Sequence, residues 1–530
     1  MKQVLFFFSL FLAAACGEKN PAAQDSTPAA PSQLSVERVG RTSVRLSWKD
    51  NSDNETGFAL YLRPSDNLSQ TECIGRTAPD VTSALIEEGL REDHSYYFGV
   101  QALGSDEEHA SRVEYTLYNL VSLAHVPVLE IVASRATDCS FVLQYRLSNY
   151  EKLSGMQYGL CWSADGTPSL QGLHQTGPVM TTTGETLLQV IPDATLETGK
   201  DYQVAVYVTS STGTWYSEPV TLRLQDAPAP IVLEWKELDA FDGVSVYETT
   251  TTVSGRKFHA WYATADPARV DFRVHVPASA ATIDAQRNAL GEKCLVLTNG
   301  GYFYDGRHTG LSIQGGVPGG SISPVRGSLR TGDSEYNVLY NVTRGLFGTD
   351  ANGKPAVWWA GYGADGKQHY YRSPLPSVRG EAQYGEVSGS QPCQPVQWTG
   401  AEALSAGPVL LYEGRIPFNF EETAKGTEYY LNNFEIMPYD IFGADVICDR
   451  TAAAFTAEGK ILLFICDGRI SESPGLNLLE LARILKGLGC THAVNFDGGG
   501  STGMMVKNTH INDITPNNRP VVSTMGFFKK

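Results

Sequence analysis

The residues that most constrain the fold form a short buried strand that runs directly into three glycines. Ala493-Val494-Asn495-Phe496 favours a buried strand, and Asp497-Gly498-Gly499-Gly500-Ser501 follows it at once. Successive glycines let backbone N–H groups approach a ligand and adopt positive φ, and consecutive N–H groups can form a nest for a phosphate or a carboxylate. Asp497, at the strand end, is expected to project toward the same place. A plain tight turn that begins with Asp is the alternative interpretation.

A helix is predicted immediately before this strand. Asn477 is placed to cap it, and Glu480, three residues later, completes a capping-box pattern. An apolar stripe at helical spacing follows, namely Leu478, Leu481, Ala482, Leu485 and Leu488. Gly487 and Gly489 are expected to end the helix. Strands, this helix and loops dense in Gly and Pro predict an α+β domain, a mixed sheet with helices, over residues 227–530.

The first part of the chain has a different pattern, in which short runs alternate apolar and polar residues between turns. Residues 44–48, 58–62 and 96–102 are such runs within the segment 34–124. Trp48 on an early strand favours a β-sandwich. At these residues the segment resembles a fibronectin type III domain, with Trp48 and the Tyr97 region as core anchors.

Residues 125–226 repeat this plan. Strand-like runs occupy corresponding places, and Tyr145 stands where the first segment has its core Trp. We therefore predict a second all-β, fibronectin type III-like sandwich, which ends before Ala227-Pro228-Ala229-Pro230. Neither module has a recurring group of His, Asp or Glu, so both are expected to be spacers, with glycan binding as the alternative.

The chain begins like an exported protein. Met1-Lys2 is followed by apolar residues 4–15, a run too short to span a bilayer but typical of a secretory signal peptide. Leu12-Ala13-Ala14-Ala15-Cys16 resembles a bacterial lipoprotein signal. Residues 1–16 are thus expected to be a signal peptide that ends at a lipidated Cys16, and residues 17–33 a flexible tether. The expected location is the bacterial cell envelope, with an ordinary signal peptide as the alternative.

Charge and cysteine content exclude some functions. The chain has 41 Lys and Arg against 58 Asp and Glu, a net charge of −17 that disfavours a role in binding nucleic acid. The nine cysteines fit no zinc motif. An odd number falls in the last domain, so complete pairing there is impossible and buried free thiols are predicted. These cysteines are Cys294, Cys393, Cys448, Cys466 and Cys490.

Polar or small residues also stand at the ends of other apolar runs in the last domain. They are Asn299-Gly300-Gly301-Tyr302-Phe303, Ser405-Ala406-Gly407-Pro408, Asp449-Arg450-Thr451-Ala452 and Cys466-Asp467-Gly468-Arg469. Because binding and catalytic residues collect at sheet ends in mixed architectures, we expect these segments to contribute to one site with Asp497.

In this order the motifs resemble those of the phosphodiester glycosidase family, over roughly residues 270–528. The Asn-apolar-Asp-Gly-Gly-Gly-Ser element is the most specific part of the resemblance. Many family members have Thr where this chain has Asn477, and Asn caps a helix as well as Thr does. The resemblance implies an enzyme that hydrolyses a sugar-1-phosphodiester, such as a GlcNAc-1-phosphodiester, to free sugar and a phosphomonoester.

Cleavage of a glycosyl phosphate needs carboxylates near the anomeric carbon and donors for the phosphate. The expected catalytic residues are Asp467 and Asp497, with Glu480 as a third candidate that its capping role explains equally well. Arg450 and Arg469 are the expected phosphate clamp, and Gly498, Gly499, Gly500 and Ser501 supply further donors. Asn299 and Asn495 are expected to bind sugar groups. Gly300, Gly407 and Thr451 complete the expected binding set, and Arg519 either lines the pocket or lies in a surface turn.

The alternative function is a non-catalytic lipoprotein that binds glycan or assists exopolysaccharide assembly. The expected partners are a phosphorylated glycan or sugar-1-phosphodiester, and a membrane through the lipid anchor. No cofactor and no metal are expected. A divalent cation such as calcium stays open, because oxygen ligands leave no compact sequence signature.

Overall fold

The structure is a computed structural model that describes most of the chain from residue 27 onward. It leaves out residues 41, 93, 117–120, 123–125, 178–179, 181–183, 193–195, 321–324, 328–337, 342, 363–365, 376–377, 380–393, 419–445 and 513–517. The predicted signal peptide, Cys16, Cys393 and most of the tether lie outside the described residues. Among those residues, no helix has both the length and the apolar character needed to cross a membrane.

The chain forms two compact units, which are described separately. The first comprises Met1–Pro127 with Asn149–Lys152, and its strands form two antiparallel sheets in the orders β1-β2-β5 and β4-β3-β6-β7, with β8 also paired to β6. The bounds are β1 Ser32–Arg38, β2 Val44–Lys49, β3 Gly57–Pro64, β4 Glu72–Thr77, β5 Ser83–Ile86, β6 Ser95–Leu103, β7 Glu114–Tyr115 and β8 Val121–Ser122. Trp48, Tyr96 and Phe98 are buried in one core, as a β-sandwich requires.

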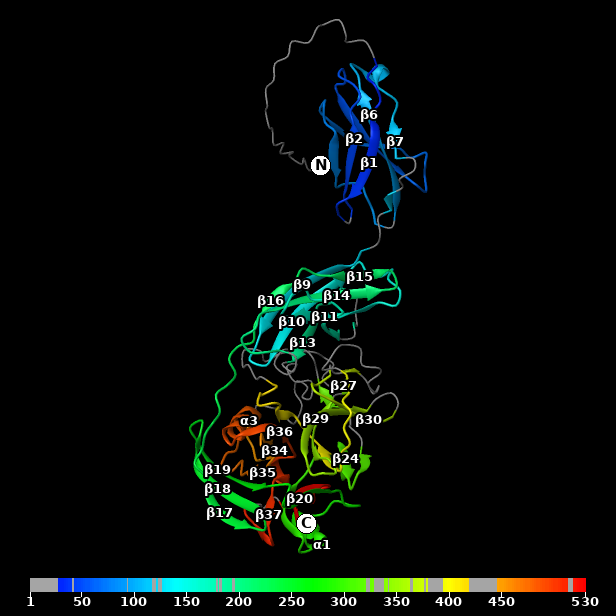
Figure 1. Cartoon of the computed structure of the whole chain (residues 1–530). Coiled ribbons are helices and arrows are strands. Elements are labelled where there is room, and N and C mark those ends of the chain that lie inside the picture. The colour runs from blue at the N-terminus through cyan, green and yellow to red at the C-terminus, as the bar shows by residue number, and fades with distance from the viewer. Residues whose placement is uncertain are drawn as a thin grey trace. The chain divides into compact units, whose positions relative to one another are not determined.

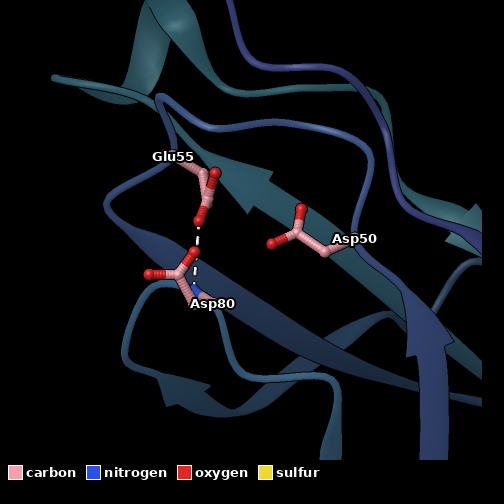
Figure 2. Close-up of side chains that lie close together, drawn as sticks. All are labelled: Asp50, Glu55 and Asp80. Carbon is pink, nitrogen blue, oxygen red and sulfur yellow. Dashed lines mark hydrogen bonds between the residues drawn. The ribbon is translucent and has the colours of Figure 1, made fainter.

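Three carboxylates lie close together in this first unit. Asp50, Glu55 and Asp80 have one oxygen each within 4.8 Å of the others (Figure 2). The buried Glu55 accepts hydrogen bonds from the Ser52 hydroxyl at 2.9 Å and from the Asp80 N–H at 3.1 Å. Because these bonds, one from the same loop and one from the loop between β4 and β5, already satisfy the buried carboxylate, the cluster alone does not indicate a metal site.

The second unit begins with a module that has the same sheet orders as the first. Its sheets are β9-β10-β13 and β12-β11-β14-β15, with β16 paired to β14. The bounds are β9 Val128–Ala136, β10 Ser140–Ser148, β11 Gln157–Ser163, β12 Leu173–Thr176, β13 Leu187–Pro192, β14 Tyr202–Ser210, β15 Gly213–Tyr216 and β16 Val220–Leu222. Tyr145 is fully buried and its hydroxyl donates to Gln189 at 2.8 Å. A second fibronectin type III domain stays a prediction, which this shared topology supports.

The rest of the second unit is built on a seven-stranded antiparallel sheet in the order β17-β18-β19-β35-β34-β36-β33. Its strands are β17 Lys236–Phe241, β18 Val244–Val253, β19 Arg256–Ala265, β33 Val409–Leu411, β34 Arg450–Thr456, β35 Ile461–Cys466 and β36 Cys490–Asn495. Ser254 and Gly255 both have positive φ in the two-residue turn between β18 and β19. Positive φ at both turn residues gives the backbone a twist that matches the twist of an antiparallel hairpin, and this favours the pairing of β18 with β19.

Two further sheets pack near the first. A five-stranded sheet has the order β20-β39-β21-β37-β38, and a six-stranded sheet has the order β25-β24-β32-β28-β29-β30. Their strands are β20 Val270–His275, β21 Cys294–Asn299, β24 Leu311–Gln314, β25 Val317–Gly320, β28 Arg344–Thr349, β29 Pro355–Tyr362, β30 Gln368–Tyr371, β32 Glu402–Ser405, β37 Met504–Val506, β38 Thr509–His510 and β39 Thr524–Lys529. Smaller sheets join β22 Phe303–Tyr304 to β23 Arg307–His308, and β26 Val325–Gly327 to β27 Val338–Asn341 and β31 Val378–Arg379.

The seven-stranded sheet is covered on both faces. One face shares a core with the other two large sheets, through residues such as Trp261, Phe347 and Phe527. The other face shares a core with α3 (Leu478–Gly487), which Figure 1 shows beside β34 and β36. Because both faces are buried, β35 is apolar along its whole length and lacks the period-two pattern of a half-exposed strand.

Helices contribute little to the described fold. They are α1 (Ile283–Leu290) and α3, together with single-turn 3₁₀ segments. The capping box predicted for α3 is confirmed, because Asn477 and Glu480 each accept the other's backbone N–H, at 2.8 and 3.1 Å. The structure is mostly β, so the α+β description of the last domain is not confirmed. Cys294, Cys466 and Cys490 are buried free thiols, as predicted.

Candidate active site

Three loops meet at one edge of the seven-stranded sheet. Arg450 pairs with Cys466 and Ala452 pairs with Asn495, so β34 begins where β35 and β36 end. Asp449, Asp467 and Asp497 therefore lie at the same edge, each one or two residues beyond a strand. The register thus brings the Asp467 and Asp497 motifs to one edge, together with Asp449, while their roles in one site stay a prediction.

The glycine loop is packed tightly against the loop that carries Asp449. The Gly499 N–H donates to the Asp449 carbonyl at 3.1 Å, and a Cβ on Gly498 would lie 2.5 Å from the same oxygen. Gly499 has φ of +58°, a conformation that costs little only for glycine. The loop is thus a fixed backbone surface with no side chains at its first two glycines.

Two arginines flank this glycine loop. A Cβ on Gly499 would lie 3.2 Å from Nη2 of Arg469, and a Cβ on Gly500 would lie 3.7 Å from Nε of Arg519. Arg519 donates to the Ser501 hydroxyl at 2.9 and 2.6 Å, and its guanidinium lies over the Phe303 ring. Both side chains are about half exposed, at 51% and 50%. They therefore present positive charge to solvent beside backbone that has no side chain in the way.

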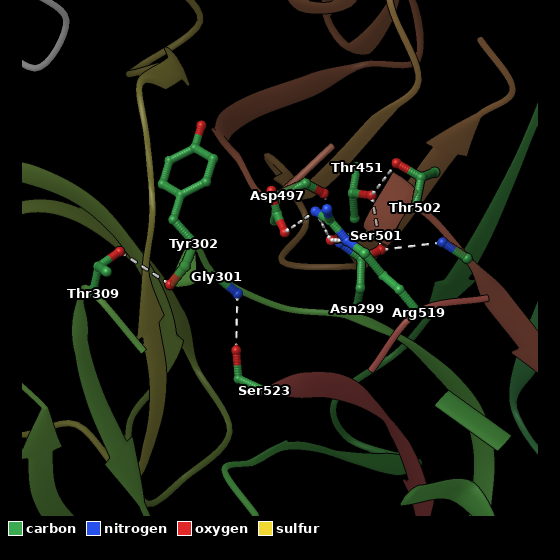
Figure 3. A network of polar contacts seen from close by, with 11 residues as sticks. Asn299, Gly301, Tyr302, Thr309, Thr451, Asp497, Ser501, Thr502, Arg519 and Ser523 are labelled. Atoms are coloured by element: carbon green, nitrogen blue, oxygen red, sulfur yellow. Dashed lines mark hydrogen bonds and ion pairs between the residues drawn. The ribbon is translucent and has the colours of Figure 1, made fainter. Parts of the chain in front are cut away.

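Each arginine is also paired with a carboxylate. Arg469 Nε donates to Asp449 at 2.8 Å, and Arg519 Nη2 lies 3.6 Å from Asp497 Oδ2, as Figure 3 shows. Burial raises the pKa of Asp497 to about 6, although hydrogen bonding to Ser501 and the charge of Arg519 act in the opposite direction. Burial also raises the pKa of Asp449, against the hydrogen bond from Arg469. Asp497 is therefore able to exchange a proton near neutral pH.

Asn299 and Thr451 support the loop instead of facing a ligand. The buried Asn299 amide donates to the Asp497 carbonyl at 2.6 Å and accepts from the Thr451 hydroxyl at 2.9 Å (Figure 3). It also accepts from the Gly503 N–H at 3.2 Å. With both ends of its amide in use and no exposed surface, Asn299 is not placed to bind sugar, and Thr451, equally buried, is not placed to bind substrate. Both expectations are wrong for that reason.

A second buried network holds Asn495. Its amide donates to the Tyr302 hydroxyl at 2.8 Å and to the Gly407 carbonyl at 3.1 Å, and Tyr302 donates to the same carbonyl at 2.6 Å. Asn495, which is 1% exposed, and Gly407 are therefore packing partners. Gly300 is also enclosed, since a Cβ there would lie 2.5 Å from the Ser523 hydroxyl. Asn495, Gly407 and Gly300 were expected to bind substrate, and none of them is placed to do so.

Arg450 and Glu480 lie on the α3 side of the sheet. Arg450 donates from Nε to the Leu476 carbonyl at 2.9 Å and from Nη2 to the Val446 carbonyl. Because successive side chains of a strand point to opposite faces, Arg450 faces away from Thr451 and the glycine loop. Glu480 caps α3 and holds the Arg256 guanidinium at 2.6 Å through both oxygens. The phosphate role of Arg450 and the catalytic role of Glu480 are thus wrong.

Asp467 lies at the sheet edge but faces β19. Its side chain is 6% exposed, and Oδ2 is 3.7 Å from Nδ1 of His259. Gly468, the next residue, packs on the Asp449 backbone so closely that a Cβ would lie 2.0 Å from the Asp449 nitrogen. The segment from Asp467 to Arg469 is consequently packed against Asp449.

The sequence motifs did not single out Asp449, and they left Arg519 undecided between the pocket and a surface turn. Asp449 is the first residue of the motif Asp449-Arg450-Thr451-Ala452, and strand alternation places it on the same face as Thr451. Arg519 reaches Ser501 across 18 residues of chain, a tertiary contact for which no local pattern exists.

Parts of the chain are similar in sequence to known proteins. Residues 292–528 match the family model described as phosphodiester glycosidase, and residues 29–116 match that of the fibronectin type III domain. The N-acetylglucosamine-1-phosphodiester alpha-N-acetylglucosaminidase of Mus musculus is 40% identical over 65 residues, and that of Homo sapiens is 38% identical over 65 residues. Each match covers 12% of this chain and 12% of the relative.

A solved structure gives a similar match. It is the zebrafish N-acetylglucosamine-1-phosphodiester alpha-N-acetylglucosaminidase catalytic domain auto-inhibited by its pro-peptide, at 18% identity and a TM-score of 0.35. The match covers 56% of this chain and 89% of that chain. A hypothetical protein from Synechocystis matches at 14% identity and a TM-score of 0.37, over 96% of this chain and 99% of that chain.

The chain is thus a multidomain protein in which a β-sandwich precedes a mostly β domain with carboxylates and arginines at one sheet edge. Residues 292–528 belong to the phosphodiester glycosidase family, and residues 29–116 are a fibronectin type III domain.

Proposed function

We propose that the last domain hydrolyses the bond between a sugar and phosphate in a sugar-1-phosphodiester. The observation that carries the proposal is the pair of half-exposed arginines, Arg469 and Arg519, on either side of a glycine loop that begins at Asp497. A bidentate guanidinium suits phosphate oxygens. The release of free sugar and a phosphomonoester from a GlcNAc-1-phosphodiester-like substrate is the finer part of this proposal.

The phosphate is expected to bind between the two guanidinium groups. Arg469 and Arg519 are held in place by Asp449 and by Ser501, and their guanidinium groups lie close to Gly499 and Gly500. Hydrogen bonds between charged groups are about twice as strong as neutral ones. A phosphodiester placed here puts its sugar carbon near Asp497.

Asp497 supplies the acid–base chemistry in this proposal. With a pKa of about 6 it is partly protonated near neutral pH. It can therefore give a proton to the departing phosphate oxygen or take one from water. Glycosidases use a second carboxylate across the anomeric carbon, and Asp467 takes that role, because β35 and β36 lie on either side of β34, with ends about 10 Å apart.

The test is release of reducing sugar from a panel of sugar-1-phosphodiesters by the full chain. Asp497→Asn and Asp467→Asn are expected to lose at least about 100-fold in kcat. Asp239→Asn, which breaks an exposed ion pair with Lys507 on another edge, is the matched control and should keep full activity. Full activity in both site variants, or glycan retention without any turnover by the wild type, would overturn the proposal. No cofactor is proposed, so activity should survive EDTA.

We also propose a location. Cys16 and the apolar residues before it are proposed to place the protein on a bacterial cell envelope through an N-terminal lipid, with the tether and sandwiches as spacers. Metabolic labelling with an alkynyl fatty acid tests this, since Cys16→Ala should lose the label. A labelled Cys16→Ala variant would refute the anchor.

A further inference from the structure

Three acid–base side chains lie in a row beside the candidate site, on three adjacent segments. Nε2 of His259, on β19, is 2.9 Å from Oε1 of Glu248 on β18. Nδ1 of the same ring is 3.7 Å from Oδ2 of Asp467, directly after β35. Glu248 and His259 lie outside residues 292–528, the part that the family model matches.

Further contacts hold His259 and Asp467 in place beside each other. The Ser473 hydroxyl donates to the Asp467 carbonyl at 2.8 Å and accepts from the His259 N–H at 3.2 Å. The Asp467 N–H donates to the His259 carbonyl at 3.1 Å. The ring centroid of Trp261 is 3.9 Å from that of His259. The backbones of His259 and Asp467 are therefore locked together, and the imidazole has little freedom to turn.

The geometry places the hydrogens. An ionised carboxylate only accepts, so the Nε2 atom of His259 carries a hydrogen that it donates to Glu248. Nδ1 of His259 then faces the Asp467 carboxylate. A proton on Nδ1 or on the carboxylate makes the interaction between the two attractive. The charged groups around the ring are Glu248 from β18 and Asp467 from the end of β35, with Lys257 exposed on β19 itself. The ring thus lies between two acids and is 29% exposed, which gives its proton a route to water.

We propose that His259, oriented by Glu248, is the positioning residue that exchanges a proton with Asp467 during hydrolysis. This rests on the proposed function, in which Asp467 acts on water. As the water oxygen bonds to the anomeric carbon, the bond from that carbon to its leaving oxygen breaks. The water proton passes to the Asp467 carboxylate and on to Nδ1 of His259, whose positive charge Glu248 stabilises. The proton leaves to solvent from the ring once the product has formed.

The first experiment needs no substrate. Ring protons of ¹³C-labelled His259 are followed by NMR from pH 5 to 9 in the full chain and in Asp467→Asn. If the two groups share a proton, removal of the carboxylate charge shifts the midpoint of the His259 titration to lower pH by at least half a unit. Asp239→Asn, far from the ring, should leave it in place. An unchanged midpoint in Asp467→Asn overturns the proposal, whatever the activity of the protein.

The second experiment separates relay from packing. His259→Ala is expected to lose about 100-fold in kcat, with KM within a factor of two of the wild type. Added imidazole is expected to raise the kcat of the variant to at least about a tenth of the wild-type value. His109→Ala is the matched control, because His109 forms an exposed pair with Asp106 in the first unit. A folded His259→Ala variant with wild-type kcat, or a loss that imidazole does not restore, refutes the relay. A wild type without turnover refutes the proposed function, while the NMR result still decides whether the pair is coupled.

Discussion

Replacement of Asp497 by Asn is expected to stabilise the last domain at alkaline pH while it abolishes turnover. The side chain is buried at 8% residue exposure, and burial is the main reason that its pKa is about 6 instead of 3.8. A carboxylate with a raised pKa favours the folded state only while it is protonated. Its ionisation in the folded protein therefore costs stability that an uncharged amide does not lose.

The size and pH range of the effect follow from the shift. At 1.36 kcal/mol per pKa unit, a rise from 3.8 to about 6 corresponds to about 3 kcal/mol. Below pH 4 both states are protonated and the cost is absent. It develops between pH 4 and 6, and above pH 6 it is complete. Because the pKa already includes the charge of Arg519, loss of that ion pair in the amide variant is part of the same figure.

Thermal unfolding of the full chain at pH 3 and at pH 8 measures this. The unfolding transition of Asp497→Asn is expected to match the wild type within error near pH 3, below both pKa values, and to lie roughly 6–12 °C higher at pH 8. Asp239→Asn supplies the control for an exposed carboxylate. A variant that is less stable than the wild type at pH 8 would show that the attraction to Arg519 exceeds the cost of burial, and would refute the assignment of Asp497 as an acid near neutral pH.

Three other substitutions test separate parts of the site. Arg519→Gln should reduce kcat/KM about 10- to 100-fold through lost charge-assisted contacts to phosphate, whereas Arg223→Gln, in an exposed pair elsewhere, should have no effect in the same kinetic assay. Gly498→Ala should destabilise the domain by about 1–3 kcal/mol in urea unfolding, because the new Cβ would lie 2.5 Å from a carbonyl; unchanged stability would contradict the packing. Glu480→Gln keeps the helix cap but loses the negative charge and one of the two oxygens that accept from Arg256. It should cost about 1–2 kcal/mol of stability and leave kcat unchanged, and a large fall in kcat would restore Glu480 as a catalytic candidate.

Local patterns predicted the elements that carry the site. The helix cap at Asn477, the buried strand before Asp497 and the glycine loop are all set by residues within a few positions of one another, and the structure has each of them. The meeting of Asp467 and Asp497 at one edge followed from strand ends alone, and the register of β34 with β35 and β36 produces it.

The direction of individual side chains was not predictable in the same way. Ala452, Ala453 and Ala454 give β34 an apolar face on both sides, because the sheet is buried on both sides. Without an alternating pattern, nothing in the sequence assigns Arg450 to one face and Thr451 to the other. The prediction that Asn299 and Asn495 bind sugar was wrong for a related reason. A side-chain amide can bond a sugar hydroxyl or a buried backbone carbonyl equally well, and only the tertiary structure decides between them.

The limits of the family match do not coincide with the limits of the sheet that forms the site. β19 pairs with β35 from Ala260–Cys466 to Ala265–Ile461, so the strand that leads into Asp467 has residues before position 292 as its neighbour. Phe258 and Trp261 of β19 are buried, one in the core beside α3 and the other in the core shared with the other sheets. Removal of β17, β18 and β19 would therefore open both cores and expose one edge of β35. One side of the environment of Asp467 is thus formed by strands that the family segment does not contain, and the proposed relay places His259 and Glu248, about 200 positions earlier in the chain, next to that carboxylate.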